Sequence, residues 1–567
     1  MHTFIHPNQF VAIKLPSDQT RLIKLVPDSL VQLGKYGNFP ANQIIGRPFY
    51  YTFEIQDTPE SDGYKLRVVS ATELHAETLI EEAEADGELD DQPEGAGSSM
   101  RTNRQIVDDA STQTLTLQEI EELKKEAGGA GKEIIAKILE SHTALDQKTA
   151  FSLAKYTLRK RMKYLKRFTV LPLDVSTLAN FMLAEKDAGR TMEMRDEHIG
   201  LLGCLGNVHH GGESTVDMLP AAKANGRYYV VDETGGLVVA AMAERMGILY
   251  PPEDDEEDSE EEEKEVVDST EKPPVITEDN ESGEPQETIS LPRRNRPRPM
   301  SASGNTITLI HAYSQPNLSL LKYFGYDINQ PNEKHPLHTH LKTVTWLQML
   351  DPSADPILSS QPVTLPAEEL AALKGGKRSA YHFKRNRYEK VKAVVEEARE
   401  GRFDGLIAAT LLEPVSVLKH LVPLLSGSSS VSIYSPTIES LVSLMDMYST
   451  ARRTTFINKK RELEAQKTSE QEPVDLSSLH EEFELDPSLL LPPTLHQTRV
   501  RAWQVLPGRT HPLMTARGGA EGYLFHGVRV IPTAQNIQAA GTFRKKRKLE
   551  STATSTPTTD QDVEMAS

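Results

Sequence analysis

Between Arg227 and Gly247 the spacing of the hydrophobic positions changes from that of a strand to that of a helix. Tyr228–Val231 is a continuous aromatic and β-branched run, as a buried strand requires. Gly235 and Gly236 follow, and Leu237–Met246 then carries apolar and small residues at helical spacing. The pattern predicts a strand, a tight turn and a helix that packs closely against a sheet.

The C-terminal half of the chain continues this alternation, which is typical of a parallel sheet covered by helices. Two late strand-like stretches, Arg499–Pro507 and Tyr523–Val530, are expected to form an antiparallel pair that closes the sheet. We therefore expect residues 201–535 to form one Rossmann-like α/β domain. Its other predicted elements are strands at 306–313, 403–409 and 430–434 and helices at 318–324, 381–400, 414–425 and 438–451.

Residues 1–75 show a different pattern, in which four short strand-like runs are separated by Gly and Pro turns. Such runs predict a small N-terminal β-barrel. Residues 76–100 are acidic and predict a flexible linker, whereas residues 101–200 have helical periodicity and predict a connecting helical region.

Polar, acidic or Pro-rich stretches near 251–303, 329–376 and 459–491 interrupt the α/β pattern and predict disordered inserts. The second of them contains His335, His338 and His340, whose spacing suggests metal ligands. No helical pattern or acidic ligand accompanies them, so we interpret them as residues of a loop and expect no metal site. Residues 536–567 form a polar tail with one basic cluster, which predicts a nuclear-import signal: Arg544, Lys545, Lys546, Arg547 and Lys548.

Composition supports folded domains diluted by polar inserts, since only 38% of the residues are hydrophobic and the mean hydropathy is -0.45. Cys204 is the only cysteine, which excludes a disulfide within the chain and a cysteine-cluster zinc site. No apolar run reaches membrane-spanning length, so we expect an intracellular protein without a membrane segment. The net charge of -19 hides dense basic clusters beside the acidic runs.

The turn after the central strand is where a Rossmann-like fold binds its nucleotide. Methyltransferases that use S-adenosylmethionine carry an acidic residue and then G-x-G-x-G there, but this chain has only Asp232-Glu233-Thr234-Gly235-Gly236. The turn is short and lacks a glycine, so we predict that the fold is kept while the cofactor site is degenerate. Asp232, Glu233, Gly235 and Gly236 should then be structural, with no catalytic residue and no cofactor in this chain.

Clusters of cations are the candidate RNA-binding residues, because such densities suit phosphate groups. The densest has six cations within residues 159–167, although a solvated helix face remains an alternative interpretation. The full set of candidates is Arg159, Lys160, Arg161, Lys163, Lys166 and Arg167, then Lys384, Arg385 and Arg387, and more weakly Arg501, Arg509, His511 and Arg517.

Several of these stretches together resemble one family, the non-catalytic, RNA-binding subunit of the eukaryotic tRNA (adenine-58-N1)-methyltransferase. The resemblance is carried by NRQIVDD (103–109), KYLKRF (163–168), DETGGLVVAAMAERMG (232–247), FDGLIAA (403–409) and WQVLPGRTHPLM (503–514). It implies a degenerate methyltransferase domain, a tRNA ligand, and a catalytic paralogue that binds S-adenosylmethionine and assembles with it as two copies of each. The basic tail predicts a nuclear location. Two alternatives stay open, namely a divergent active methyltransferase and an RNA-binding scaffold in translation initiation.

Overall fold

The computed structural model describes a large part of the 567 residues. These are residues 3–56, 65–74, 114–116, 118–120, 122, 131–142, 150–210, 226–251, 305–330, 335–366, 369–370, 373–465, 477–498, 503–506, 509–512 and 521–532. The chain divides into a unit spanning Met1–Val530 and a unit spanning Ile531–Ser567. The predicted linker at 76–100, nearly all of the insert near 251–303 and the tail at 536–567 lie outside the described residues.

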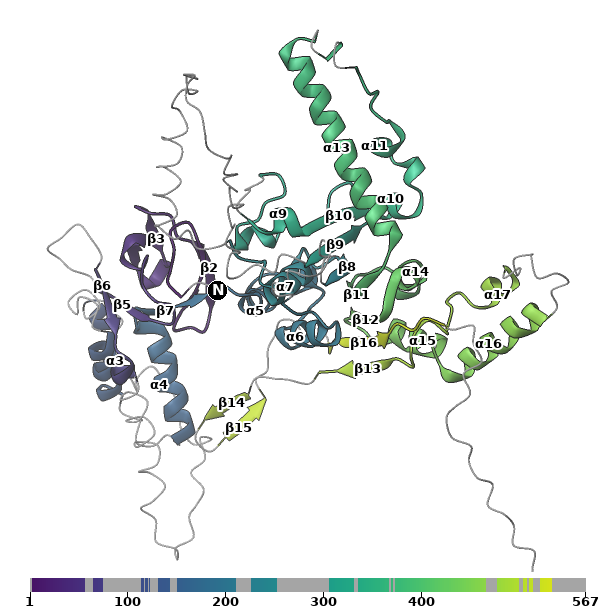
Figure 1. Cartoon of the computed structure of the whole chain (residues 1–567). Helices are drawn as coiled ribbons and strands as arrows, with labels where there is room; N and C mark the ends of the chain where they lie inside the picture. Colours follow the sequence, from purple (N-terminus) through teal and green to yellow (C-terminus); the bar gives the residue numbers. More distant parts are fainter. Residues whose placement is uncertain are drawn as a thin grey trace, which may run out of the picture. The chain divides into compact units, whose positions relative to one another are not determined.

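A seven-stranded sheet forms the centre of the α/β domain, in the strand order β10-β9-β8-β11-β12-β16-β13 (Figure 1). The strands from β10 to β12 pair in parallel, and β16 is antiparallel to both of its neighbours. In chain order they are β8 (Arg227–Asp232), β9 (Thr306–His311), β10 (Leu341–Thr345), β11 (Phe403–Ala409), β12 (Leu425–Ser435), β13 (Thr494–Gln497) and β16 (Tyr523–Val528). The Rossmann-like domain predicted from the sequence is therefore confirmed in its central sheet.

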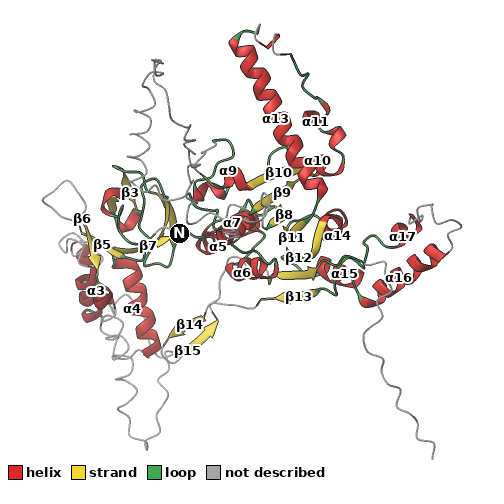
Figure 2. Ribbon diagram, viewed as in Figure 1, coloured by secondary structure: helices red, strands yellow, loops and turns green. Residues whose placement is uncertain are grey.

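Strand β8 shows why the sheet has a core on each face. Tyr228 and Val230 pack into one hydrophobic cluster, and Tyr229 and Val231 pack into a second one, because successive side chains point to opposite faces. The first cluster includes residues of α5 (Val175–Glu185), α6 (Asp196–Leu205) and α7 (Leu237–Met246). The second includes residues of α13 (Gly375–Glu400), α14 (Pro414–Leu421) and α15 (Glu439–Met447). Figure 2 shows helices on both sides of the strands.

The antiparallel closure of the sheet differs in part from the prediction. The predicted strand at 523–530 is present as β16, but its outer neighbour is β13 and not the stretch around Trp503. That stretch forms β14 (Trp503–Leu506), which pairs with β15 (Arg509–Pro512) in a separate hairpin. The physical reason is local, since only two residues separate β14 from β15, so they pair with each other as a hairpin.

The N-terminal region is a five-stranded antiparallel sheet in the order β2-β1-β7-β5-β6, and among the described residues no pairing closes it into the predicted barrel. Its strands are β1 (Phe10–Lys14), β2 (Thr20–Lys24), β5 (Thr52–Gln56), β6 (Lys65–Val69) and β7 (Arg167–Pro172), and β3 (Leu30–Gln32) pairs with β4 (Asn38–Pro40). The central strand β7 corrects the prediction of a wholly helical 101–200 region. Phe168 on β7 stacks on Phe39 and Phe53, so this strand completes the core of the N-terminal sheet.

The region predicted to be helical at 101–200 contains helices on both sides of β7. Before β7 lie α3 (Gly131–Glu140) and α4 (Ala150–Tyr164), and after it lie α5 and α6. Among the described residues, the 3-10 helices are η1 (Gly34–Tyr36), η2 (Ala41–Gln43), η6 (Ala188–Thr191), η7 (Leu321–Phe324), η8 (Pro352–Ala354) and η9 (Val422–Leu424). The late helices are α16 (Thr450–Ala465) and α17 (Ser477–Glu482), so parts of the predicted insert at 459–491 are helical.

The predicted disordered insert at 329–376 is also corrected, because it contains the edge strand β10. Around β10 lie α9 (Leu337–His340), α10 (Trp346–Leu350) and α11 (Pro356–Ser359). His335 and His340 are buried, and their rings hydrogen-bond to the carbonyl oxygens of Phe324 and Asn305 at 3.2 and 2.7 Å. These histidines therefore anchor the segment to the sheet. Within the described ranges no cluster of three or more His, Cys, Asp or Glu residues suits a metal ion.

In the part of the chain that the structure describes, every helix is too short or too polar to cross a bilayer.

Candidate cofactor turn and nucleic-acid interface

The turn between β8 and α7 has the backbone conformation that only glycine adopts without strain. Gly235 has a φ of 76° and Gly236 a φ of 94°, and Gly236 is the N-cap of α7. This confirms that the two glycines form the strand-to-helix turn, as predicted.

Asp232 occupies the end of α7 at which a Rossmann-like fold binds an anionic ligand. One carboxylate oxygen accepts hydrogen bonds from the Thr234 amide at 2.7 Å and the Thr234 hydroxyl at 2.6 Å. The other oxygen accepts from the Val239 amide at 3.0 Å, inside the first turn of the helix. Burial raises the pKa of Asp232, and these hydrogen bonds oppose that shift. The helix terminus is thus satisfied by a side chain of the same protein.

Glu233 is likewise used within the structure. Its carboxylate accepts hydrogen bonds from the Thr410 hydroxyl at 2.9 Å and the Leu411 amide at 2.7 Å, directly after β11. It therefore ties the carboxyl ends of β8 and β11 together. The Leu411 side chain is 79% exposed, so the loop after β11 presents an apolar group at the edge where α/β enzymes place their ligands.

The segment that follows β9 lies directly over the glycine turn. The Leu320 amide donates to the Gly235 carbonyl at 3.0 Å. A Cβ atom at Gly236 would lie 3.2 Å from the Cα of Leu318, and both leucines are buried. Backbone and apolar side chains of the same chain therefore fill the space beside the turn, which the sequence pattern did not reveal.

The end of β9 is a second place that lacks a residue for binding a nucleotide. In Rossmann-like nucleotide sites an Asp or Glu at the end of the second strand binds the ribose hydroxyls. Here β9 ends at His311, which is nearly buried and has no hydrogen-bond partner for Nδ1 in the described structure. Burial lowers the pKa of His311, which favours the neutral form of the ring. The absence of an acid after Ile310 is visible in the sequence but was not used in the prediction.

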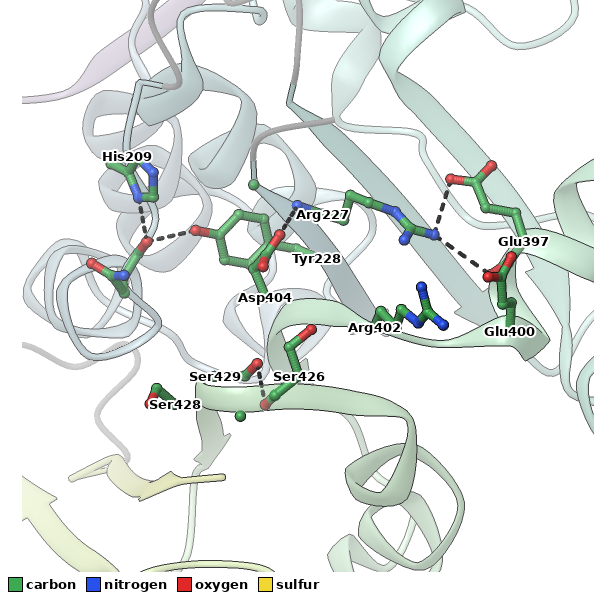
Figure 3. Close-up of a pocket in the computed structure, with 13 residues that line it drawn as sticks. His209, Arg227, Tyr228, Glu397, Glu400, Arg402, Asp404, Ser426, Ser428 and Ser429 are labelled. Carbon is green, nitrogen blue, oxygen red and sulfur yellow. Dashed lines mark hydrogen bonds and ion pairs between the residues drawn. The ribbon is translucent and has the colours of Figure 1, made fainter. Parts of the chain in front are cut away.

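A cavity of about 810 Å³ lies at the opposite edge of the sheet, beside the amino ends of β8, β11 and β12 (Figure 3). The Arg227 side chain crosses it, with Nη2 3.2 Å from a carboxylate oxygen of Glu397 and its guanidinium 4.3 Å from the centre of the Phe403 ring. The Arg227 amide donates to the Asp404 carboxylate at 2.9 Å. These charged groups hold strands and α13 together, and the cavity lies at the edge opposite to the usual ligand site.

One predicted RNA contact, Arg167, is corrected by the structure. Its side chain lies on β7 and is buried, with Nε 3.3 Å from Glu54 and Nη2 3.2 Å from Glu73. Arg67 contacts the same two carboxylates. A guanidinium enclosed by two carboxylates cannot reach a phosphate group, so Arg167 is a structural residue of the N-terminal sheet.

The other cations of this cluster are less buried than Arg167. Arg159 and Lys163 on α4 are exposed, whereas Lys160 and Arg161 are half-buried. The ammonium groups of Lys160 and Lys163 lie 4.8 and 5.3 Å from the ring centres of Tyr156 and Tyr164. Lys166 lies between α4 and β7 and is half-buried. These five residues stay candidates for phosphate contacts.

Helix α13 carries the second predicted cluster, and its charges run against the helix dipole. Lys377 and Arg378 lie in the positive first turn, whereas three acids, Glu396, Glu397 and Glu400, outnumber the one cation, Arg399, at the negative end. Cations at a helix N-terminus are unfavourable, so this distribution does not serve the stability of the helix. Figure 1 shows the N-terminal half of α13 extending beyond the sheet.

The three predicted residues on α13 differ in their surroundings. Lys384 and Arg387 are exposed, and neither has an ion pair within the described ranges. Arg385 is half-buried, and its Nε lies 2.8 Å from Glu389. Lys384 and Arg387 are therefore the stronger candidates. Of the weaker candidates, Arg509 and His511 lie on β15, and Arg501 and Arg517 fall outside the described residues, as does the basic cluster at 544–548.

The sheet order and the glycine turn define a methyltransferase-type Rossmann fold in which the cofactor turn is filled by the protein itself. Residues 4–374 match the Gcd10p family, and the chain belongs to this family. This confirms the resemblance identified in the sequence.

Three relatives share the name tRNA (adenine(58)-N(1))-methyltransferase non-catalytic subunit trm6. The relative from Aspergillus oryzae is 60% identical over 584 residues, and the alignment covers 100% of both chains. The relative from Aspergillus fumigatus is 58% identical over 588 residues, with 100% of both chains covered. The relative from Schizosaccharomyces pombe is 30% identical over 553 residues, covering 97% of this chain and 96% of its own.

Solved structures are more distant. A SAM-dependent O-methyltransferase from Thermotoga maritima has a TM-score of 0.38 and 9% identity, covering 94% of this chain and 97% of its own. The fold assignment therefore depends on the strand order and pairing described above.

Proposed function

We propose that this chain is the non-catalytic, tRNA-binding subunit of a tRNA (adenine-58-N1)-methyltransferase. In this proposal a catalytic paralogue binds S-adenosylmethionine and transfers the methyl group to N1 of adenosine 58. The chain described here binds no cofactor and supplies part of the surface that holds the tRNA. The name shared by relatives that align over nearly the whole chain supports the role of a non-catalytic subunit.

The observation that carries the proposal is the hydrogen bonding of Asp232. A Rossmann-like fold offers free amides at the N-terminus of its first helix to an anionic group of the ligand. Here the Val239 amide donates to Asp232 instead, and Leu318 and Leu320 lie against the glycines. A bound cofactor would have to displace the Asp232 carboxylate, Leu318 and Leu320. Its ribose would also lie beside His311, where other Rossmann-like sites have an acid.

The exposed cations support the role in tRNA binding. Phosphate contacts dominate the affinity of nucleic-acid complexes, and they position the RNA without reading its sequence. Lys384 and Arg387 on α13 and Arg159 on α4 are exposed and suited to this task.

Assembly and location belong to the same proposal. A methyltransferase fold without a cofactor site is most simply explained as one half of a pseudosymmetric pair, and we propose two copies of each subunit in the complex. We also propose that the cluster at 544–548 directs the protein to the nucleus.

Methyl transfer by the purified complex tests this function. The chain is co-expressed with its catalytic paralogue, and transfer of labelled methyl groups is measured on a tRNA with adenosine 58 and on the same tRNA with guanosine 58. We expect activity only when both subunits are present and only on the first tRNA. Methyl transfer by this chain alone, or undiminished tRNA binding and activity of the paralogue without it, would refute the proposal.

A further inference from the structure

Helix α13 presents an exposed aromatic side chain in its most basic part. Residues 375–392 contain seven Lys or Arg residues and one Glu. Phe383 lies in the middle of this stretch with 72% of its side chain exposed. Singly exposed apolar side chains are common on protein surfaces, so the case for a ligand depends on the charged residues around this ring.

The opposite face of α13 is the one that the chain covers. Tyr381 is half-buried, and its hydroxyl accepts a hydrogen bond from the Leu365 amide at 3.1 Å. Residues two positions apart in a helix are separated by about 200° around its axis. Phe383 therefore points away from the segment that covers Tyr381. Within the described ranges, no ring contact involving Phe383 is found.

The face that carries Phe383 is cationic. Residues four and seven positions further along a helix lie on the same face, which places Arg387 and Lys390 on the face of the ring, one and two turns along the helix. Both are exposed, and no ion pair in the described part of the chain involves either of them. The face therefore combines one aromatic ring with two cations that are available to a ligand.

We propose that Phe383 stacks on an unstacked base of the bound tRNA while Arg387 and Lys390 contact the neighbouring phosphates. This inference rests on the proposed tRNA-binding function and names a stacking site within it. Proteins that bind single-stranded or looped RNA combine aromatic rings with a cationic surface, and each stacked base contributes affinity that does not depend on its identity.

The charge distribution favours RNA over a protein partner for this face. The cores of protein interfaces are depleted of lysine, because its ammonium group loses hydration there. Lys384, Arg387 and Lys390 all follow Phe383 within seven residues, and the nearest acid, Glu389, is paired with Arg385. Such a face complements a polyanion with splayed bases.

Three variants of the complete complex test the proposal. Phe383→Leu keeps an apolar side chain and helix propensity but removes the aromatic ring, whereas Phe383→Trp keeps the ring. Arg387→Gln removes one charge from the same face. The dissociation constant for tRNA is measured for each variant at several salt concentrations, and co-purification with the catalytic subunit is checked by gel filtration.

We expect Phe383→Leu to raise the dissociation constant by about 5- to 100-fold without changing its salt dependence. Phe383→Trp should bind within about twofold of the unmodified complex, and its added fluorescence should be quenched by tRNA because a stacked base contacts the indole. Arg387→Gln should instead reduce the salt slope by about one unit.

Unchanged tRNA affinity in Phe383→Leu would overturn the proposal, as would a Phe383→Trp variant that binds as weakly as Phe383→Leu. Loss of the catalytic subunit from Phe383→Leu, with normal tRNA affinity in the complex that remains, would identify the face as a protein interface and also overturn it. If the unmodified complex did not bind tRNA, the proposed tRNA-binding function itself would be refuted. That result is distinct from a failure of the stacking proposal alone.

Discussion

Replacing Arg167 with alanine should destabilise the N-terminal sheet by a predictable amount. Arg167 is 5% exposed, and its guanidinium lies between the carboxylates of Glu54 and Glu73. Removing one partner of a buried ion pair costs about 3–5 kcal/mol, because a charge is left without compensation. Arg67 also contacts both carboxylates, so we expect the lower limit, about 3 kcal/mol.

Hydrogen–deuterium exchange of the intact complex measures this change locally. Peptides that cover β5 and β7 should exchange roughly 150-fold faster in Arg167→Ala, since 1.36 kcal/mol corresponds to a factor of ten. Arg159→Ala, which removes an exposed cation of α4, is the matched control and should leave β5 and β7 unchanged. Adding Glu54→Gln to Arg167→Ala should recover part of the protection, because the stranded charge is then removed.

The opposite pattern would refute this reasoning. If Arg167→Ala exchanged like the unmodified protein while the salt slope of tRNA binding fell by about one unit, Arg167 would be a phosphate contact after all.

Three further predictions concern the turn, a buried carboxyl group and the basic helix. Gly236→Ala should destabilise the protein by about 1–3 kcal/mol, because the backbone of Gly236 is left-handed. Gly376→Ala, with no atom within 4 Å of an added Cβ, should instead stabilise α13 by about 0.5–1 kcal/mol. Thermal unfolding of the two variants checks this. Burial and the neighbouring carboxyl group raise the pKa of Glu197 from 4.5 to about 7. Its protonated form therefore stabilises the fold fully below pH 4.5, and this contribution is lost as the pH rises through 7. Glu197→Gln should accordingly raise the melting temperature more at pH 8 than at pH 5. An equal rise at both pH values would contradict a raised pKa of Glu197. Changing Lys384 and Arg387 together to alanine should weaken tRNA binding and reduce its salt slope by about two units, with unchanged assembly by gel filtration.

The sequence was informative where local chemistry decides the structure. The strand–turn–helix at 228–246 was predictable, because a β-branched run, two glycines and a helical apolar pattern are all short-range signals. The alternation that follows it likewise predicted β11, β12 and the helices between them. The family resemblance was visible in the same stretches.

Three of the structural features that the sequence did not predict depend on long-range contacts, which override the local pattern. β7 was hidden because Arg167 continues a cationic run, and only Glu54 and Glu73, which are distant in sequence, explain its burial. β10 was hidden because an edge strand needs few apolar residues, and its sequence LKTVT is largely polar. The covering of the glycine turn by Leu318 and Leu320 is a tertiary contact that no spacing in the sequence reveals.

The number of S-adenosylmethionine molecules bound per complex tests the central claim most directly. Calorimetric titration of the assembled complex should give one site for each pair of one catalytic and one non-catalytic subunit. A complex whose catalytic subunit carries an inactivated cofactor site should bind none. Two sites per pair, or one remaining site after that inactivation, would show that the turn from Asp232 to Gly236 still binds the cofactor and would contradict the account.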